Sequence, residues 1–290
     1  MAEFLQFFFS GLTVGAVYAL VALGFTMIYN ASGVVNFAQG EFVMLGGMLT
    51  VFLGYAGLPI AAAAILAIVI TACIGLLLNK LAIEPARNAS IVSLIIITIG
   101  ASIFLRGTAQ VVFDKQIHRF PAFTGEAPFV IGGATILPQS LWVLAGAAAV
   151  FAALYLFVTY SITGKAIRAT ANNRLAAMLV GIDVRFVLTL SFALSAAIGA
   201  LAGVLVTPIT NTAFDVGVPL ALKGFAAAML GGMGVPAGAL VGGLLLGLVE
   251  AMTAGYVSSA YKEAVAFVVI LAVLFVMPQG LFGKAATERV

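Results

Sequence analysis

The sequence contains several apolar runs of about 20 residues, and these runs restrict the fold more than any other feature. The longest are residues 5–28, 91–112, 140–160, 186–206 and 236–256. A helix of that length crosses the hydrocarbon core of a bilayer, whereas the strands of a membrane barrel would alternate polar and apolar residues. The runs therefore predict an all-α integral membrane protein.

The composition supports this fold class. Only 8% of the 290 residues are charged, and 63% are hydrophobic. A soluble domain carries about 25% charged residues, so no soluble fold of this size would bury so much apolar surface. The net charge of +3 is explained by basic cytosolic loops and gives no reason to expect nucleic-acid binding. The amino end lacks the basic region of a cleaved signal peptide, so the first run is expected to be a retained span.

Further apolar segments complete the predicted membrane domain, which we take as one unit over residues 1–290. Spans are expected at 59–78 and 260–276, and two shorter segments lie at 42–55 and 219–233. Counting every segment gives nine crossings. If the short segments are re-entrant, eight full spans are the alternative. Broken helices of this kind are typical of transporters.

A basic polar segment, Gly164–Arg185, sets the expected orientation. Placing it in the cytosol also places 79–90 and the carboxyl terminus there, and these inside segments then hold eight of the 13 basic residues. This agrees with the excess of Lys and Arg in cytoplasmic loops. The amino terminus and the loop 113–138 are then external. A small hairpin is expected within this loop, around Gly132 and Gly133.

The same basic segment contains a short amphipathic helix signal. Asn172 is predicted to cap its amino end, and Gly181 is placed to end it. Between them, four apolar residues recur at helical spacing: Leu175, Met178, Leu179 and Ile182. We expect this helix to dock on a cytosolic partner.

The motif Met-Leu-Gly-Gly-Met occurs at 44–48 and again at 229–233. In the expected topology the two copies run in opposite directions, which predicts an inverted internal repeat. The alternative is a chance match, which a chain rich in small and apolar residues makes easy. Glycines four residues apart, such as Gly11 and Gly15 or Gly243 and Gly247, predict close helix packing.

Nothing in the sequence predicts an enzyme. The Gly283-Lys284 pair lacks the other residues of an ATP-binding P-loop. His118 is the only histidine and is expected to be solvated or packed in the external loop, so no Ser/His/Asp set and no His/Cys metal site can be assembled. No catalytic residue, metal or cofactor is expected.

Polar residues near the apolar runs are candidates for lining a transport path, because such groups are costly in lipid and usually face a cavity. Asn36, Gln39 and Glu41 lie between the first two runs. They form either a plain interfacial loop or part of the path.

Four charged residues in or beside the runs have simpler expected roles. Arg106 is expected to extend to the outer interface. Asp215 and Lys223 are expected to pair with each other at a helix entrance. Glu250 stays open between a structural role and a role in the path.

Four stretches resemble a known family. They are GLTVGAVYALVALGFTMIYNASGVVNFAQGEFVMLGGML from Gly11, GKAIRATANNRLAAMLVGIDV from Gly164, AAAMLGGMGVPAGALVGG from Ala226, and MPQGLFG near the end. Together they resemble the H-type permease of bacterial branched-chain amino acid ABC importers. The resemblance implies a bacterial inner-membrane protein that pairs with a second homologous permease, two cytosolic ATP-binding subunits and an external substrate-binding protein. Permeases for urea and short amides look similar, and a stand-alone secondary carrier or channel is the further alternative.

The resemblance also implies roles for two sets of residues. The segment 164–185 would be the helix that couples to the ATP-binding subunits, through Gly164, Arg168, Asn172, Leu175, Met178, Leu179 and Gly181. The loop 113–138 would contact the binding protein. Our own hypothesis for the path of the amino acid is the broken-helix regions, namely Asn36, Gln39, Glu41, Gly46, Gly47, Gly231 and Gly232.

Overall fold

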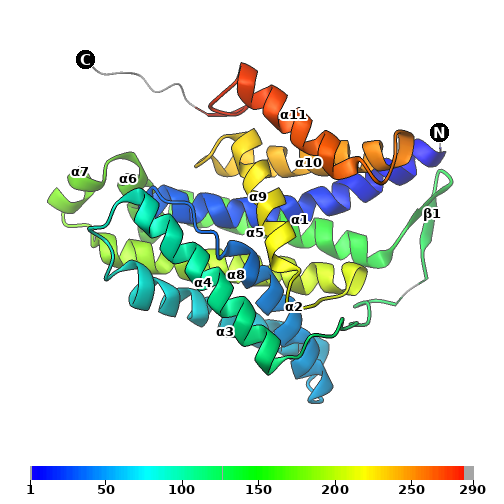
Figure 1. Ribbon diagram of the computed structural model, residues 1–290, viewed down its shortest axis with the longest axis horizontal. Helices are drawn as coiled ribbons and strands as arrows, with labels where there is room; N and C mark the ends of the chain where they lie inside the picture. The colour runs from blue at the N-terminus through cyan, green and yellow to red at the C-terminus, as the bar shows by residue number, and fades with distance from the viewer. Residues whose placement is uncertain (1, 126, 284–290) are drawn as a thin grey trace.

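The computed structural model describes residues 2–125 and 127–283, which are almost entirely helical (Figure 1). In chain order the elements are α1 (Ala2–Ser32), α2 (Gln39–Tyr55), α3 (Ile60–Leu78), the π-helical turn η1 (Asn79–Ile83), α4 (Ile91–Val112), β1 (Phe129–Ile131), β2 (Ala134–Ile136), α5 (Pro138–Tyr160), α6 (Ile162–Asn172), α7 (Arg174–Leu179), α8 (Val184–Thr210), α9 (Gly217–Gly231), α10 (Pro236–Tyr256) and α11 (Lys262–Val276).

Six of the described helices are long and apolar enough to cross a membrane: α1, α3 with η1, α4, α5, α8 and α10. This confirms an all-α membrane fold. The helices α2, α9 and α11 have only 17, 15 and 15 residues, so the total of eight or nine crossings stays a prediction.

The central helix of the bundle is α1. In its most apolar window 89% of the residues are buried, against 11% in α4 and 17% in α5, which places α4 and α5 at the surface that lipid or a partner would cover. Glycines let α1 and α10 approach closely. The backbone of Gly15 lies against Gly247, and Gly11 lies against the backbone of Leu248. The predicted close packing of these glycine pairs is confirmed.

Two breaks in the chain lie inside the bundle. The side chain of Gln39, the first residue of α2, lies against Gly24 of α1, which is eight residues before the end of that helix at Ser32. At 1.5 Å per residue, this is about 12 Å from the end of α1. Gly217, the first residue of α9, packs on the carbonyl of Gly40. Both short helices therefore begin within the bundle, and α9 runs across α1 rather than along it (Figure 1).

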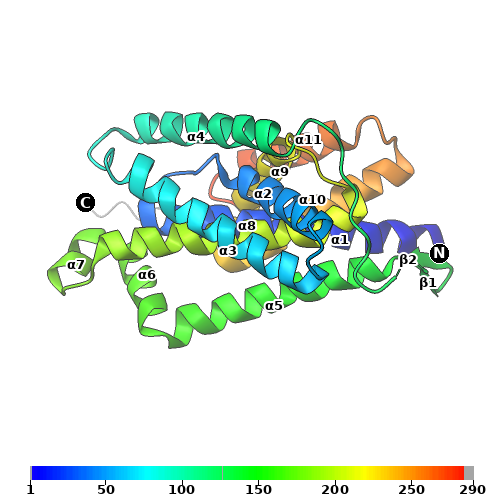
Figure 2. The same cartoon turned by 90° about the horizontal axis from the view of Figure 1, so that it is seen from below.

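The two ends of the bundle are distinct (Figures 1 and 2). At the hairpin end, β1 and β2 pair antiparallel and the side chain of Gln6 donates to the carbonyl of Thr135 at 3.0 Å. The predicted hairpin is confirmed, with Gly132 and Gly133 both at positive φ. At the opposite end, which we call the basic end, lie η1, α6 and α7. This grouping matches the predicted topology, while the compartment that each end faces stays a prediction.

The basic segment contains the predicted short helix, but the predicted capping residue at its amino end is wrong. The Oδ1 atom of Asn173, not of Asn172, accepts the N–H of Ala176 at 3.0 Å. Asn172 is the last residue of α6, a helix that was not predicted from the sequence. The predicted end is confirmed, because Gly181 has φ +86° and its N–H donates to the carbonyl of Met178. With the Ile182 N–H bonded to the carbonyl of Ala177, this is a Schellman motif.

Candidate functional site

The first break places three polar side chains in the interior. Asn36, Gln39 and Glu41 are 0, 0 and 1% exposed, so the interpretation as a plain interfacial loop is wrong. Gln39 bridges to α8, since Ser195 Oγ donates to Gln39 Oε1 at 2.6 Å and Gln39 Nε2 donates to the Ser195 carbonyl at 3.2 Å. These bonds satisfy the Gln39 amide, which would otherwise be costly to bury.

Two of these side chains keep unused hydrogen-bonding capacity among the described residues. Glu41 Oε1 accepts the hydroxyl of Ser102 at 2.8 Å, while Glu41 Oε2 has no partner. Asn36 Oδ1 accepts the N–H of Ala38 at 3.1 Å, while Asn36 Nδ2 has none. Buried groups of this kind call for an explanation such as water or a ligand.

The candidate path glycines lie at helix contacts. Gly46 packs on Ala200 of α8, and a Cβ on Gly47 would lie 2.5 Å from the Thr207 hydroxyl. Gly231 packs on Gly238, and Gly232 forms the turn after α9 at φ +106°. The structure does not bring the Gly231–Gly232 pair together with the break at 36–41. A role for these glycines in the path stays a prediction.

A charged network that the sequence reading missed joins four helices. Lys223 Nζ of α9 lies 2.7 Å from Glu250 Oε1 of α10 and 3.1 Å from Glu263 Oε1 of α11. The hydroxyl of Tyr18 in α1 donates to Glu250 Oε2 at 2.7 Å. The predicted pairing of Lys223 with Asp215 is therefore wrong. The available signal was the presence of Lys223 and Glu250 in separate apolar runs.

The ring of His118 is packed, which is one of the two alternatives expected for it. It lies 4.8 Å from the ring of Phe52, and its Nε2 is 3.1 Å from Asp114 Oδ1. Its backbone also pairs with Thr212. In the described part of the chain no group of three or more His, Cys, Asp or Glu residues is arranged to hold a metal ion.

The short helix α7 displays its apolar residues outward. Leu175 is 70% and Leu179 is 88% exposed, and Met178 is also exposed, while Ala177 on the other side is buried. Figures 1 and 2 show α7 projecting at the basic end, beyond the long helices. Large exposed apolar side chains gathered on one short helix are typical of a protein contact.

The helix α6, which precedes α7, packs closely on α5. Gly164 lies directly against the carbonyl of Phe157 and the Cα of Val158 in α5, so any side chain there would collide with backbone. Ile167 and Thr170 are buried on the same face. Arg168 and Asn172 are exposed, which leaves them free to contact a partner.

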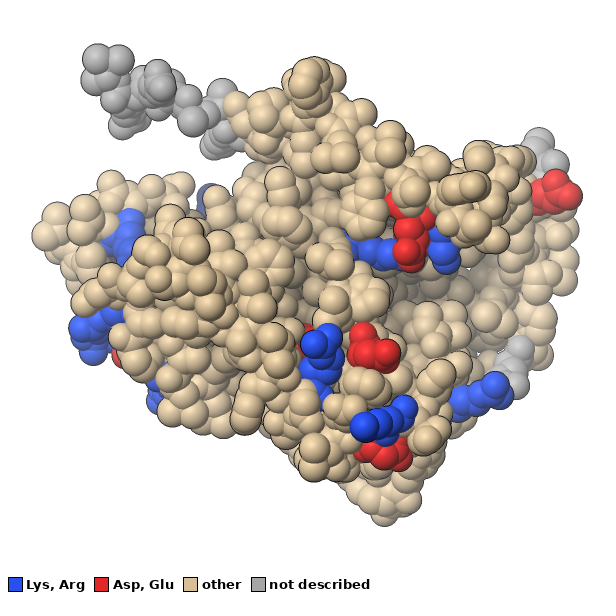
Figure 3. Space-filling model, in the orientation of Figure 1, with Lys and Arg blue, Asp and Glu red and all other residues tan. Residues whose placement is uncertain are grey.

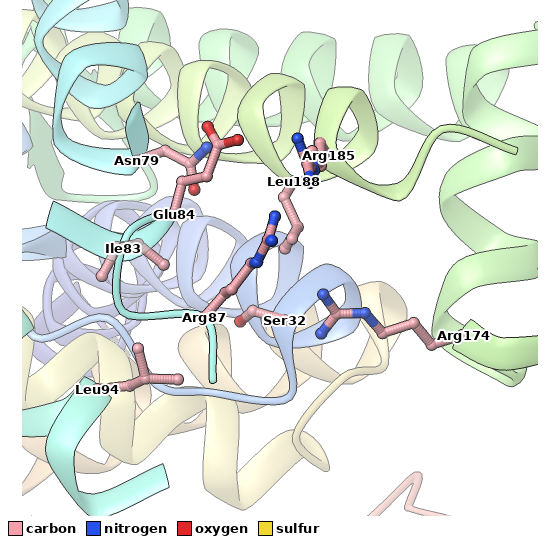
Figure 4. Close-up of a pocket in the computed structure, with 9 residues that line it drawn as sticks. All are labelled: Ser32, Asn79, Ile83, Glu84, Arg87, Leu94, Arg174, Arg185 and Leu188. Carbon is pink, nitrogen blue, oxygen red and sulfur yellow. The ribbon is translucent and has the colours of Figure 1, made fainter. Parts of the chain in front are cut away.

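Beside α7 lies a small cleft that is lined by basic side chains from three segments (Figure 4). Arg174 begins α7, Arg185 begins α8, and Arg87 comes from the loop after η1. None of the three forms an ion pair with the described residues. All three were expected in cytosolic loops, but nothing in the sequence predicts that Arg87 lies beside the other two.

Comparison with known proteins agrees with this geometry. Residues 7–274 match the family described as branched-chain amino acid transport system, permease component. The chain is 36% identical to the high-affinity branched-chain amino acid transport system permease protein LivH of Escherichia coli K12 and 35% identical to LivH of Salmonella typhimurium, in both cases over 99% of this chain and 98% of the relative. It is 34% identical to the permease protein BraD of Pseudomonas aeruginosa over the same shares.

A solved structure shows the same fold at a greater distance. The structure of PsaBC from Streptococcus pneumoniae in complex with Fab aligns with a TM-score of 0.50 and 16% identity, over 96% of this chain and 94% of that one. The relatives are transport components and not enzymes, in agreement with the absence of a predicted catalytic set. The chain belongs to the permease component family of branched-chain amino acid transport systems.

Proposed function

We propose that this protein is the membrane-spanning subunit of an ATP-driven importer of branched-chain amino acids, and that it couples to ATP-binding subunits through α7. The family match and the relatives that align over nearly the full chain support the substrate class. They do not favour urea, short amides or a stand-alone carrier. The observation that carries the coupling role is the exposed apolar face of α7, which projects beyond the long helices.

The proposed assembly contains a second homologous permease, two cytosolic ATP-binding subunits and an external substrate-binding protein, in a bacterial inner membrane. The basic end then faces the cytosol, because Lys and Arg concentrate in cytosolic loops. The carboxyl terminus is inside and the amino terminus is outside. The hairpin and its flanking loop, 113–138, face the binding protein.

The proposed coupling begins when the ATP-binding subunits close and displace α7. The residues that act are those of the segment 164–185: Gly164, Arg168, Asn172, Leu175, Met178, Leu179 and Gly181. Gly164 leaves no gap between α6 and α5. A displacement of α7 is therefore transmitted through α6 to α5. The Schellman turn at Gly181 passes the same push to α8.

The proposed path of the amino acid follows the breaks at α2 and α9, with Asn36, Gln39 and Glu41 as its polar groups and Gly46, Gly47, Gly231 and Gly232 as its narrow points. Glu41 Oε2 and Asn36 Nδ2 have no hydrogen-bond partner among the described residues, so each could form a hydrogen bond with a polar group of the substrate. The first copy of the repeated motif lies within α2, whereas the second spans the end of α9 at Gly231, so the inverted repeat stays a prediction.

The test of the coupling role replaces one exposed side chain of α7. In the complete complex in liposomes, Leu179→Asp is expected to abolish ATP-driven leucine uptake and its stimulation of ATP hydrolysis. The fold is preserved because Leu179 is 88% exposed. The control is Val257→Asp, at a residue that is 70% exposed at the hairpin end. Wild-type uptake by Leu179→Asp would remove α7 from the coupling surface.

A further inference from the structure

Three arginines from separate parts of the chain converge on one cleft at the basic end. Arg87 follows η1, Arg174 begins α7 and Arg185 lies in the first turn of α8. Figure 4 shows the guanidinium groups of Arg87 and Arg174 pointing into the cleft. All three residues are exposed, so none of them fills the core. In Figure 3 the charged side chains at this end of the molecule are mainly Lys and Arg.

The three guanidinium groups have no ion-pair partner among the described residues. Two acids also line the cleft, Glu84 and Asp183, and Asp183 Oδ1 already accepts two backbone N–H groups of α8. The cleft therefore keeps a net positive charge. Like charges that lie close together repel one another unless an anion lies between them. A guanidinium group binds a carboxylate through two parallel N–H···O bonds, so a carboxylate is a matching ligand.

The cleft opens into a groove whose other wall is apolar. The groove has a volume of about 560 Å³, which lies in the range of about 300–1,000 Å³ for ligand-sized sites. Its apolar wall is formed by Leu175, Met178 and Ile182. Leu175 and Met178 also belong to the exposed α7 surface that the proposed function assigns to the ATP-binding subunits. A partner that covers this surface of α7 therefore also covers the arginines.

An anionic lipid headgroup is the other ligand that a basic cleft between helices can hold. The position of the groove favours a protein. The helix α7 projects beyond the long helices, so the groove lies at the end of the molecule rather than along the sides of the spans (Figures 1 and 2). Arg and Met are also enriched at protein interfaces, in agreement with the residues that line the groove.

We propose that this arginine cleft, formed by Arg87, Arg174 and Arg185, binds a carboxylate side chain of an ATP-binding subunit. The inference rests on the proposed function, and it adds a second docking segment, the turn at 84–90, to α7. The segment of the partner is acidic and apolar. Its carboxylate meets the guanidinium groups, and its apolar side chains meet Leu175 and Met178.

The second docking segment leads directly into α4. Ser90 caps this helix by accepting a backbone N–H of its first turn at 3.1 Å. Further along, α4 is hydrogen-bonded to the first break. The N–H of Phe37 donates to Thr98 Oγ1 at 3.2 Å, and the hydroxyl of Ser102 donates to Glu41 Oε1 at 2.8 Å. An ATP-binding subunit that holds the turn at 84–90 therefore acts on the break through α4 as well as through α8.

The first experiment joins the paired groups covalently. Arg87→Lys places an amine in the cleft, and a carbodiimide forms an amide between an amine and a carboxylate in contact, taking up the water that is released. In the complete complex, Lys at position 87 is expected to cross-link to an Asp or Glu of an ATP-binding subunit, which mass spectrometry identifies. The wild-type complex has no amine at this position and is the control.

A second experiment measures the Kd of the ATP-binding subunits for the permease in liposomes. Arg87→Gln and Arg174→Gln are each expected to raise this Kd roughly tenfold, because hydrogen bonds between charged groups are lost. The matched control is Lys80→Gln, at an exposed basic residue of the same end that does not line the cleft, and it keeps the wild-type Kd. At saturating ATP-binding subunits, Arg87→Gln still imports less leucine per ATP hydrolysed than wild type, because the contact that leads to α4 is missing.

The proposal is overturned if Lys at position 87 cross-links only to Glu84 or Asp183 of its own chain, or if both Gln variants keep the wild-type Kd. A wild-type Kd together with uptake that follows the anionic phospholipid content of the liposomes would assign the cleft to a lipid. Full coupling of Arg87→Gln at saturation would remove α4 from the route. Failure of the proposed function is seen separately, as a wild-type chain that binds no ATP-binding subunit or imports no leucine.

Discussion

The contact between Gly164 and α5 gives a prediction whose sign depends on the structure. Gly164 lies in the first turn of α6, and in an isolated helix Gly→Ala stabilises by about 1 kcal/mol. Here the added Cβ would collide with the carbonyl of Phe157 and lie 2.5 Å from the Cα of Val158. Backbone atoms cannot rotate away as a side chain can. Overpacking of this kind costs about 1–3 kcal/mol, so the collision outweighs the gain in helix propensity.

Gly164→Ala is expected to lower the free energy of unfolding by about 1–2 kcal/mol and to displace α6 away from α5. The control is Gly100→Ala in α4, where a Cβ meets nothing within 4 Å. It is expected to leave stability unchanged or to raise it by up to about 1 kcal/mol. The two variants are compared by their unfolding midpoints in detergent and by leucine-stimulated ATP hydrolysis in the complete complex. If Gly164→Ala is as stable and as well coupled as Gly100→Ala, the close contact and its role in transmitting movement are both refuted.

Three further predictions concern other parts of the molecule. Asn173→Ala is expected to destabilise α7 by about 1 kcal/mol through loss of its cap, and Asn172→Ala to have little effect, as measured by hydrogen exchange of the α7 amides. Arg87→Glu is expected to weaken association with the ATP-binding subunits, and the weakening should disappear at high salt if it is electrostatic, as measured by co-purification. Tyr18→Phe is expected to lower the free energy of unfolding by about 1–3 kcal/mol, because a buried oxygen of Glu250 loses its hydrogen-bond donor. The unfolding midpoint measures this change.

Features set by local sequence were predictable. The long spans, the turn of the hairpin at Gly132 and Gly133, and the end of α7 at Gly181 each depend on residues close together in the chain. The cap of α7 was assigned to Asn172 because two asparagines are adjacent and either could cap a helix. Only the start of the following helix at Arg174 distinguishes them.

Features set by distant residues were not predictable. Lys223 and Glu250 are 27 positions apart, and Gln39 and Ser195 are 156 apart. Asp215 was the nearer acid to Lys223 in sequence, but proximity in sequence does not decide which carboxylate a transverse helix meets. The apolar face of α7 was predicted as a docking surface from its own residues. The position of Arg87 beside α7 depends instead on how η1 continues α3.

The helix α8 connects the basic end to the interior of the bundle. Its 27 residues extend about 40 Å, which exceeds the hydrocarbon thickness of about 30 Å, so the helix is longer than a membrane crossing requires. That first turn is capped by Asp183 directly after the turn at Gly181, and the same helix carries Ser195, which is bonded to Gln39 at the first break. The same helix therefore follows α7 at one end and is hydrogen-bonded to the first break near its middle. We expect displacement of α7 to reach the polar residues at 36–41 through this helix.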